Sequence, residues 1–218
     1  MRFDPLLFAA LPVVLFSVIV HECAHGLMAL WCGDTTARDR GRLTLNPLPH
    51  IDPIGSILLP AVLLLTHAPF LFGWARPVPI NWANLRRPKD DAVKVALAGP
   101  ASNLLLALLF AVLVRVAPDA GFWSPLQTMA VGGVVWNCAL ALFNLIPIPP
   151  LDGSWVIMRF LRLRQILILH QFRLVGLVVV AAALSSPRIS NFVLHAPVLA
   201  LTRACLGLFG VSTQGLQL

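Results

Sequence analysis

Charged side chains are scarce in this chain, at 11% of 218 residues, whereas soluble domains carry about 25%. Hydrophobic residues make up 58%, and the mean hydropathy is +0.84. This balance argues against an ordinary soluble domain and favours a protein embedded in a membrane. The four cysteines form no CxxC pair, so neither a disulfide framework nor a thiolate metal site is indicated. We interpret them as small buried apolar residues.

Several apolar runs are long enough to cross a hydrocarbon core of roughly 30 Å. They predict an all-α polytopic membrane protein, a single domain spanning residues 1–218 with about five to six transmembrane helices. The expected helices cover residues 5–31, 92–114, 126–146 and 166–184, with a weaker run at 196–211. We expect residues 5–160 to form the core and 165–211 to add accessory helices. No small-residue cleavage site follows the first run, so we expect it to be retained as a span.

The 16 Lys and Arg residues give a net charge of +7, but they gather beside apolar runs and so indicate membrane orientation rather than nucleic-acid binding. Under the positive-inside rule, three basic connecting regions face the cytoplasm, and they contain Arg38, Arg40, Arg42, Arg76, Arg86, Arg87, Lys89, Lys94, Arg159, Arg162 and Arg164. The apolar run at 54–72 lies between two of these regions. It is therefore predicted to be a re-entrant or short β element, with a full span as the alternative.

The only glutamate in the sequence, Glu22, lies between His21 and His25 inside the first apolar run. A charged residue at the centre of a membrane helix costs roughly 2.5–3.5 kcal/mol, so this carboxylate is a functional candidate. The three residues spell H-E-x-x-H. On a helix, both imidazoles then share one face and can bind one zinc ion, while the glutamate acts as general base.

A catalytic zinc ion usually takes a third protein ligand. Asp152 is our candidate, because the other aspartates lie in polar loops or at the chain start. It follows the run at 126–146, where prolines break the helix. Two alternatives stay open: Asp152 could instead cap the next helix, or another histidine could supply the ligand. Those histidines are His50, His67, His170 and His195.

Three motifs in this order resemble the site-2 protease family of intramembrane zinc metalloproteases: HECAH at 21–25, AGPASN at 98–103 and NLIPIPPLDG at 144–153. GRLTLNPLPHIDPIGS and GWARPVPIN are similar to a prokaryotic subgroup without PDZ or CBS domains. The resemblance implies one Zn²⁺ per chain held by His21, His25 and Asp152, with Glu22 as catalytic base. It also implies a catalytic role for Asn103, near substrate or its carbonyl. Candidate substrate-binding residues in these motifs are Asn81, Gly99, Pro100 and Asn144.

The expected reaction is hydrolysis of a transmembrane protein or peptide near the cytoplasmic side of a lipid bilayer, in a bacterial cytoplasmic membrane. Zinc makes water acidic enough for Glu22 to take its proton as that water attacks the scissile carbonyl. Substrate must be extended, and residues 41–57 and 73–81 could pair with it as an edge strand, although their prolines equally suit a rigid loop. Rival interpretations are a metal or proton transporter, which usually shows repeated halves, and an inactive scaffold, which needs no general base.

Overall fold

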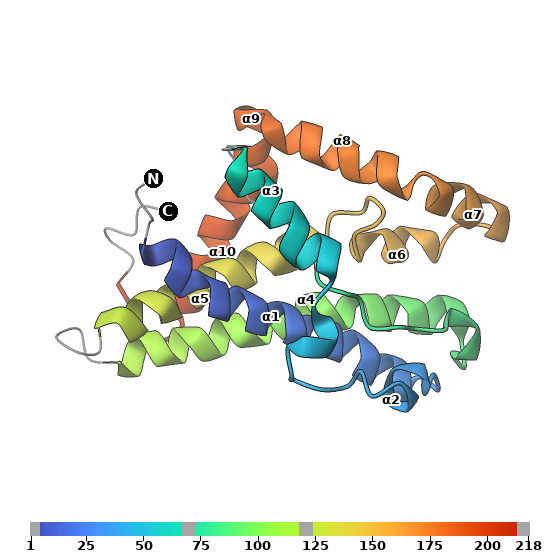
Figure 1. Ribbon diagram of the computed structural model, residues 1–218, viewed down its shortest axis with the longest axis horizontal. Coiled ribbons are helices and arrows are strands. Elements are labelled where there is room, and N and C mark those ends of the chain that lie inside the picture. The colour runs from blue at the N-terminus through green and yellow to red at the C-terminus, as the bar shows by residue number, and fades with distance from the viewer. Residues whose placement is uncertain (1–4, 67–72, 118–123, 213–218) are drawn as a thin grey trace.

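The computed structural model describes residues 5–66, 73–117 and 124–212, and every regular element in this part of the chain is a helix (Figure 1). The order is α1 Pro5–Trp31, α2 Thr36–Asp39, η1 Leu48–His50, η2 Pro53–Leu58, α3 Leu59–Leu65, η3 Trp82–Asn84, α4 Pro88–Val116, α5 Ser124–Asn144, α6 Gly153–Met158, α7 Leu163–Gln171, α8 Arg173–Ser185, α9 Pro187–Ser190, η5 Asn191–His195 and α10 Ala196–Gly207. The all-α class predicted from the sequence is confirmed.

The centre of the protein is a bundle of α1, α4 and α5, with α10 packed against α4 and α5. Small side chains fill the α4–α5 contact, and Ala107, Ala111 and Ala130 are completely buried there. Such residues let membrane helices approach closely. Close packing matters because lipid tails are as apolar as the side chains, so the hydrophobic effect does not drive the helices together. The bundle brings α1 and α4 into contact, and both His21 and His25 of α1 are hydrogen-bonded to α4.

Four helices in the described part of the chain are long and apolar enough to cross a membrane: Leu11–Trp31, Pro88–Val116, Pro125–Asn144 and Pro187–Gly207. The first three match predicted spans. The fourth begins nine residues before the predicted run at 196–211, because Pro187 starts a helix that η5 and α10 continue. Proline suits a first helical turn, since its missing N–H has no helix partner there.

The predicted helix at 166–184 is instead two elements, α7 and α8, with a break at Phe172. Polar residues Gln171 and Arg173 flank that break. At about 1.5 Å per residue, α8 alone reaches about 20 Å, short of a membrane span. The count of five to six spans is therefore not reached among the described residues, and α8 lies to one side of the bundle (Figure 1).

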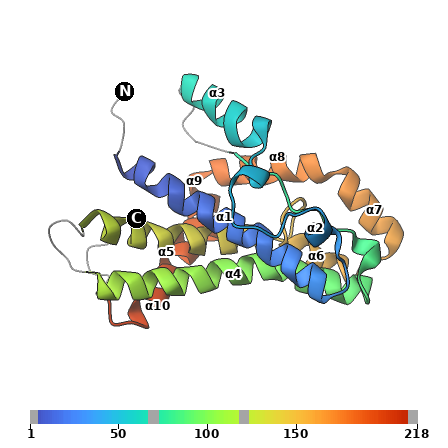
Figure 2. The same cartoon turned by 60° about the horizontal axis from the view of Figure 1, so that its bottom comes forward.

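The run predicted as a re-entrant or short β element is helical over Pro53–Leu65, and residues 67–72 lie outside the described part. No described residue lies in a strand, so the predicted β element is absent from residues 41–57 and 73–81. Figure 2 shows α3 projecting away from the α1–α4–α5 bundle. Its re-entry into the membrane stays a prediction.

The basic connecting regions gather at one end of the bundle. Figure 1 places α2, the start of α4, and α6 with α7 at this end, while α4 finishes at the other. Two contacts tie the region together: Arg159 pairs with Asp90 at 2.9 Å, and Lys89 donates to the Leu161 carbonyl at 3.1 Å. This distribution is the one that the charge rule requires of a cytoplasmic end.

Candidate metal centre

Two histidines stand one turn apart on α1 and face the same way. Their rings meet edge to face, with centroids 4.6 Å apart and planes at 89°. The Nε2 atom of His25 lies 3.0 Å from that of His21. Both side chains are buried, so the i, i+4 spacing of the sequence presents two nitrogen atoms to one point inside the protein.

Asp152 reaches the same point from the loop between α5 and α6. The helix ends at Asn144, and Pro147, Pro149 and Pro150 prevent its continuation because they lack an amide hydrogen. The chain then turns into α6, where the Ser154 amide and hydroxyl both donate to the Leu151 carbonyl. Asp152 occupies the cap position of α6 but makes no capping hydrogen bond. Its carboxylate points to the histidines instead.

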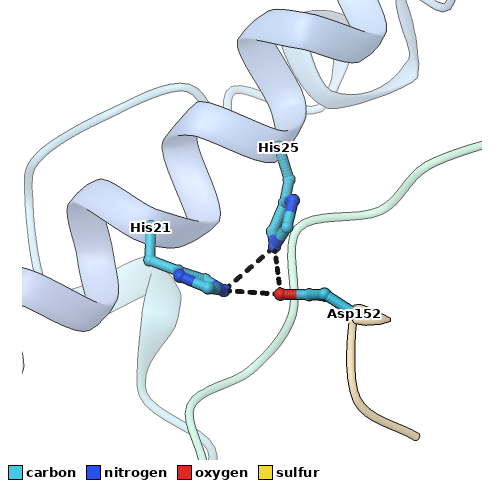
Figure 3. Close-up of side chains that lie close together, drawn as sticks. All are labelled: His21, His25 and Asp152. Carbon is cyan, nitrogen blue, oxygen red and sulfur yellow. Dashed lines mark hydrogen bonds and ion pairs between the residues drawn. The ribbon is translucent and has the colours of Figure 1, made fainter. Parts of the chain in front are cut away.

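The three ligand atoms form a compact triangle (Figure 3). Asp152 Oδ2 lies 3.2 Å from His21 Nε2 and 3.3 Å from His25 Nε2. Ligands about 2.0–2.2 Å from one tetrahedral zinc ion are separated by about 3.3–3.5 Å, so the triangle has the size that zinc needs. No fourth His, Cys, Asp or Glu of the described chain joins this group. A catalytic zinc site has this composition, three protein ligands and one open position.

One face of α4 contacts both imidazoles and fixes the orientation of their rings. His25 Nδ1 lies 2.7 Å from the Val95 carbonyl, and His21 Nδ1 lies 2.5 Å from Asn103 Oδ1. Gly99 lies between these two α4 residues, and a side chain there would meet both rings at 2.5 Å. Because a carbonyl only accepts, His25 must carry a proton on Nδ1, and in its neutral form it then leaves Nε2 bare. Partners of this kind are what orient the histidines of zinc sites.

A proton on Nδ1 rather than Nε2 of each histidine also explains why one carboxylate oxygen of Asp152 has no hydrogen-bond partner. Asp152 Oδ2 is buried and accepts no hydrogen bond, although both Nε2 atoms are within 3.3 Å. If neither Nε2 carries a proton, neither can donate to it. Three electron-pair donors then face one another without a proton between them, an arrangement that a divalent cation satisfies. The residues present therefore fit zinc.

Glu22 faces a cavity of about 380 Å³ beside the ligands. The cavity is lined by His21, Glu22, His25, Pro77, Val78, Ile80, Trp82, Ala96, Asn144, Pro150, Asp152 and Trp155. The Val78 amide donates to Glu22 Oε2 at 2.8 Å, which holds the carboxylate in place. Trp82 and Trp155 stack with centroids 4.0 Å apart, joining η3 to α6 across the cavity wall.

The wall around Val78 is anchored by Asp34, which is completely buried just after α1. Its carboxylate accepts hydrogen bonds from the Asn81 amide at 2.7 Å and from the Asn84 side chain at 3.0 Å. Thr36 donates to it through both its amide and its hydroxyl. Burial raises the pKa of Asp34, but these hydrogen bonds together lower it by a larger amount. The pKa of Asp34 therefore lies below its ordinary value. Asp34 therefore fastens Asn81 and Asn84, which follow the cavity-lining residue Ile80, to the end of α1.

Comparison with known proteins finds relatives named as zinc metalloproteases. The chain is 41% identical over 150 residues to "Putative zinc metalloprotease YwhC" of Bacillus subtilis, covering 66% of this chain and 65% of the relative. It is 34% identical over 143 residues to "Putative zinc metalloprotease Rip2" of Mycolicibacterium smegmatis, covering 64% and 52%. It is 32% identical over 192 residues to Rip2 of Mycobacterium tuberculosis H37Rv, covering 83% and 71%. The chain belongs to the site-2 protease family.

The chain spans less than two thirds of YwhC and about half of the M. smegmatis Rip2. No family model matches it, and no solved structure matches it. In the present chain, the three motifs of the sequence meet at one point. His21 and His25 come from the first motif, Gly99 and Asn103 from the second, and Asp152 from the third.

Of the remaining predicted site residues, some line the cavity and others do not. Asn144 lines the cavity, and its side chain donates to the Leu140 carbonyl. Asn81 is exposed, accepts from the Ala83 amide and is not among the residues that line the cavity. Pro100 is buried in α4, outside the cavity lining. Asn103 is also fully buried, and its hydrogen bonds are with His21 and Asn137, while its catalytic role stays a prediction.

The alternative histidine ligands do not reach the group in the described chain. His50 is buried near the cavity wall, where its Nε2 lies 2.9 Å from the Thr44 carbonyl. His195 is exposed in η5. His67 lies outside the described residues, and the side chain of His170 is not described.

Sequence reasoning missed several residues of this site. Asn137 is an amide in the middle of an apolar run, and Ser17 lies one turn before His21, so each carried the signal of a polar group in a membrane helix. Asp34, which was assigned to a polar loop, carried no such signal. Trp82 and Trp155 carried no such signal either, since tryptophan is common at membrane interfaces.

Proposed function

We propose that this site-2 protease relative is a zinc metalloendopeptidase that hydrolyses peptide bonds of transmembrane substrates near the cytoplasmic side of a bacterial cytoplasmic membrane. The observation that carries the proposal is the meeting of His21 Nε2, His25 Nε2 and Asp152 Oδ2 within 3.0–3.3 Å of one another. Glu22 faces the cavity beside them. The relatives' names support the zinc and the peptidase class.

The chain's own residues divide the chemistry between them. His21, His25 and Asp152 would hold one Zn²⁺, which when bound polarises a carbonyl and makes water acidic near neutral pH. Glu22 takes a proton from the attacking water and passes it to the leaving amine. The Val78 amide fixes one oxygen of Glu22, so the other stays available for proton transfer. General base catalysis of this kind typically contributes 10²–10⁴-fold in rate, roughly.

Substrate would enter as an extended segment, because a helix keeps its carbonyls in hydrogen bonds. Residues 77–80 are not helical, and Pro77, Val78 and Ile80 line the cavity, which supports recognition of an extended backbone there. The site lies near the basic end of the bundle, as the positions of α2 and α6 indicate (Figure 1). This location supports cleavage near the cytoplasmic face.

The test compares wild type with Glu22→Gln and Asp152→Asn in liposomes, with zinc content measured alongside cleavage of a model transmembrane peptide. We expect Glu22→Gln to keep zinc and to lose about 10²–10⁴-fold in cleavage rate. Asp152→Asn should lose more zinc affinity than the roughly 10–100-fold that an outer partner contributes. Asp39→Asn, a change in an exposed carboxylate on α2, is the matched control. Undiminished cleavage by Glu22→Gln would refute the assigned mechanism.

The transporter alternative makes the opposite prediction in the same vesicles. A carrier would move zinc or protons across the membrane, and peptide cleavage would be absent from wild type. No observation on the described residues favours it, because the three ligands face a cavity that also contains a general base.

A further inference from the structure

A line of buried polar side chains crosses three helices and ends at His21. Ser17 on α1, Asn137 on α5 and Asn103 on α4 are each completely buried. Asn137 Nδ2 donates to Ser17 Oγ at 2.9 Å and to the Gly133 carbonyl at 2.8 Å. Asn103 Nδ2 donates to Asn137 Oδ1 at 2.9 Å. The proposed function uses neither Ser17 nor Asn137.

The direction of every hydrogen bond in this line follows from two backbone carbonyls. Ser17 gives its hydroxyl proton to the Val13 carbonyl at 2.8 Å, so its oxygen can only accept from Asn137. The Gly133 carbonyl also only accepts. Both require the amide nitrogen of Asn137 to face them, which turns its oxygen toward Asn103.

The same logic then fixes Asn103. The oxygen of Asn137 requires the amide nitrogen of Asn103, so the oxygen of Asn103 faces His21 Nδ1. An oxygen acceptor requires a proton on Nδ1, and in the neutral imidazole this leaves Nε2 bare for a metal. His25 is held in the same Nδ1-protonated form directly by a backbone group, the Val95 carbonyl. His21 has no backbone carbonyl in that position and depends on the longer line.

We propose that Asn137 and Ser17 are positioning residues that, through Asn103, hold His21 in the Nδ1-protonated form and so prepare its Nε2 for zinc. This inference rests on the proposed zinc function. Three polar side chains at membrane depth are costly unless they are fully paired, and this line pairs each of them. A packing role alone would not need the amide of Asn137 to have a defined direction.

The first test replaces Asn137 with leucine, which has a similar size and no polar atom. Asn103 then loses the acceptor for its nitrogen and can turn that nitrogen toward His21, favouring the wrong protonated form. We expect zinc affinity, measured by competition with a chelator, to fall about 10–100-fold. Thr202→Val is the matched control, since Thr202 is equally buried but lies on α10, outside the line. It should bind zinc like wild type.

The second test is a rescue. Asn103→Asp in the Asn137→Leu background presents an acceptor to His21 whichever way the side chain turns, so zinc affinity should recover. The visible spectrum of the Co²⁺-loaded protein should change in Asn137→Leu and return in the double variant. If Asn137 only fills space, the second substitution buries an unpaired carboxylate and restores neither.

The outcomes separate this proposal from the proposed function. Failure of wild type to bind zinc would overturn the function itself. Wild-type zinc affinity in Asn137→Leu, or no recovery in the double variant, would overturn only the positioning role. If Asn137→Leu fails to give a folded helical protein, Ser17→Ala decides. It should weaken zinc binding about two- to tenfold, the value of one neutral hydrogen bond, whereas unchanged affinity would count against the line.

Discussion

Gly99→Ala is the substitution for which the structure gives the sharpest expectation. Gly99 lies on α4 opposite the two histidines, midway between Val95 and Asn103. A methyl group there would lie 2.5 Å from the Cε1 atoms of both rings and from His25 Nε2. Carbon atoms in contact normally stay about 3.5–4.0 Å apart, so the rings or the helix must move by about 1 Å.

A displacement of that size is large for a metal site, where ligand distances must stay within about 0.2 Å of their ideal values. The rings cannot simply tilt away, because the Nδ1 atom of each is hydrogen-bonded to α4, at 2.7 Å for His25 and 2.5 Å for His21. If α4 withdraws by about 1 Å, both bonds exceed the usual limit of about 3.2 Å. We therefore expect zinc affinity to fall by at least about 10–100-fold.

The assay is chelator competition for zinc in detergent, with thermal unfolding of the metal-free protein recorded in parallel. Gly132→Ala is the control, because Gly132 is also a glycine within a membrane helix but a methyl group there would touch nothing within 4 Å. That change should leave zinc affinity unaltered and, if anything, favour the helix by up to about 1 kcal/mol. Equal zinc affinity in Gly99→Ala and Gly132→Ala would refute the close approach of α4 to the ligands.

Two further predictions concern residues that hold the site from outside. Gly176 on α8 lies so close to the Pro149 carbonyl that a side chain there must displace the loop carrying Asp152; Gly176→Val should lower zinc affinity, and Gly207→Ala, a helical glycine with open space around it, should not. Asp34→Asn should destabilise the protein by about 1–3 kcal/mol at pH 7, because hydrogen bonds to a buried carboxylate are lost. Since the folded pKa of Asp34 is lowered, its contribution is complete above the ordinary aspartate pKa of about 3.9 and is lost as pH falls through the folded value, so the variant and wild type should converge in unfolding experiments at low pH.

The residues of the candidate metal centre could be predicted from the sequence because polar residues stand out in membrane segments. His21, Glu22 and His25 interrupt an apolar run, and Asp152 follows a run broken by prolines, so each stands out against its surroundings. The spans α1, α4 and α5 were accessible for the related reason that their length and apolar character leave few alternatives.

Other features depend on contacts between segments that are distant in sequence. The line from Ser17 to Asn103 requires three helices to meet, and no local pattern on α5 says which neighbour Asn137 faces. The break at Phe172 interrupts a run whose composition is mostly apolar on both sides. Residues 73–81 were expected to pair as an edge strand but find no neighbouring strand among the described residues. Separate hydrogen bonds hold them instead, among them those of the Val78 amide to Glu22 and of the Asn81 amide to Asp34.

Helix α4 donates no ligand, yet it dictates where both imidazoles stand. Grafting HECAH onto another apolar helix would transfer the two histidines and the glutamate but not the helix that orients the imidazole rings. To work, the graft would need a second helix that offers a carbonyl, a gap and an amide at successive four-residue steps, as Val95, Gly99 and Asn103 do here. The transferable unit of this protein is thus a pair of helices together with the loop that carries Asp152, not a five-residue signature.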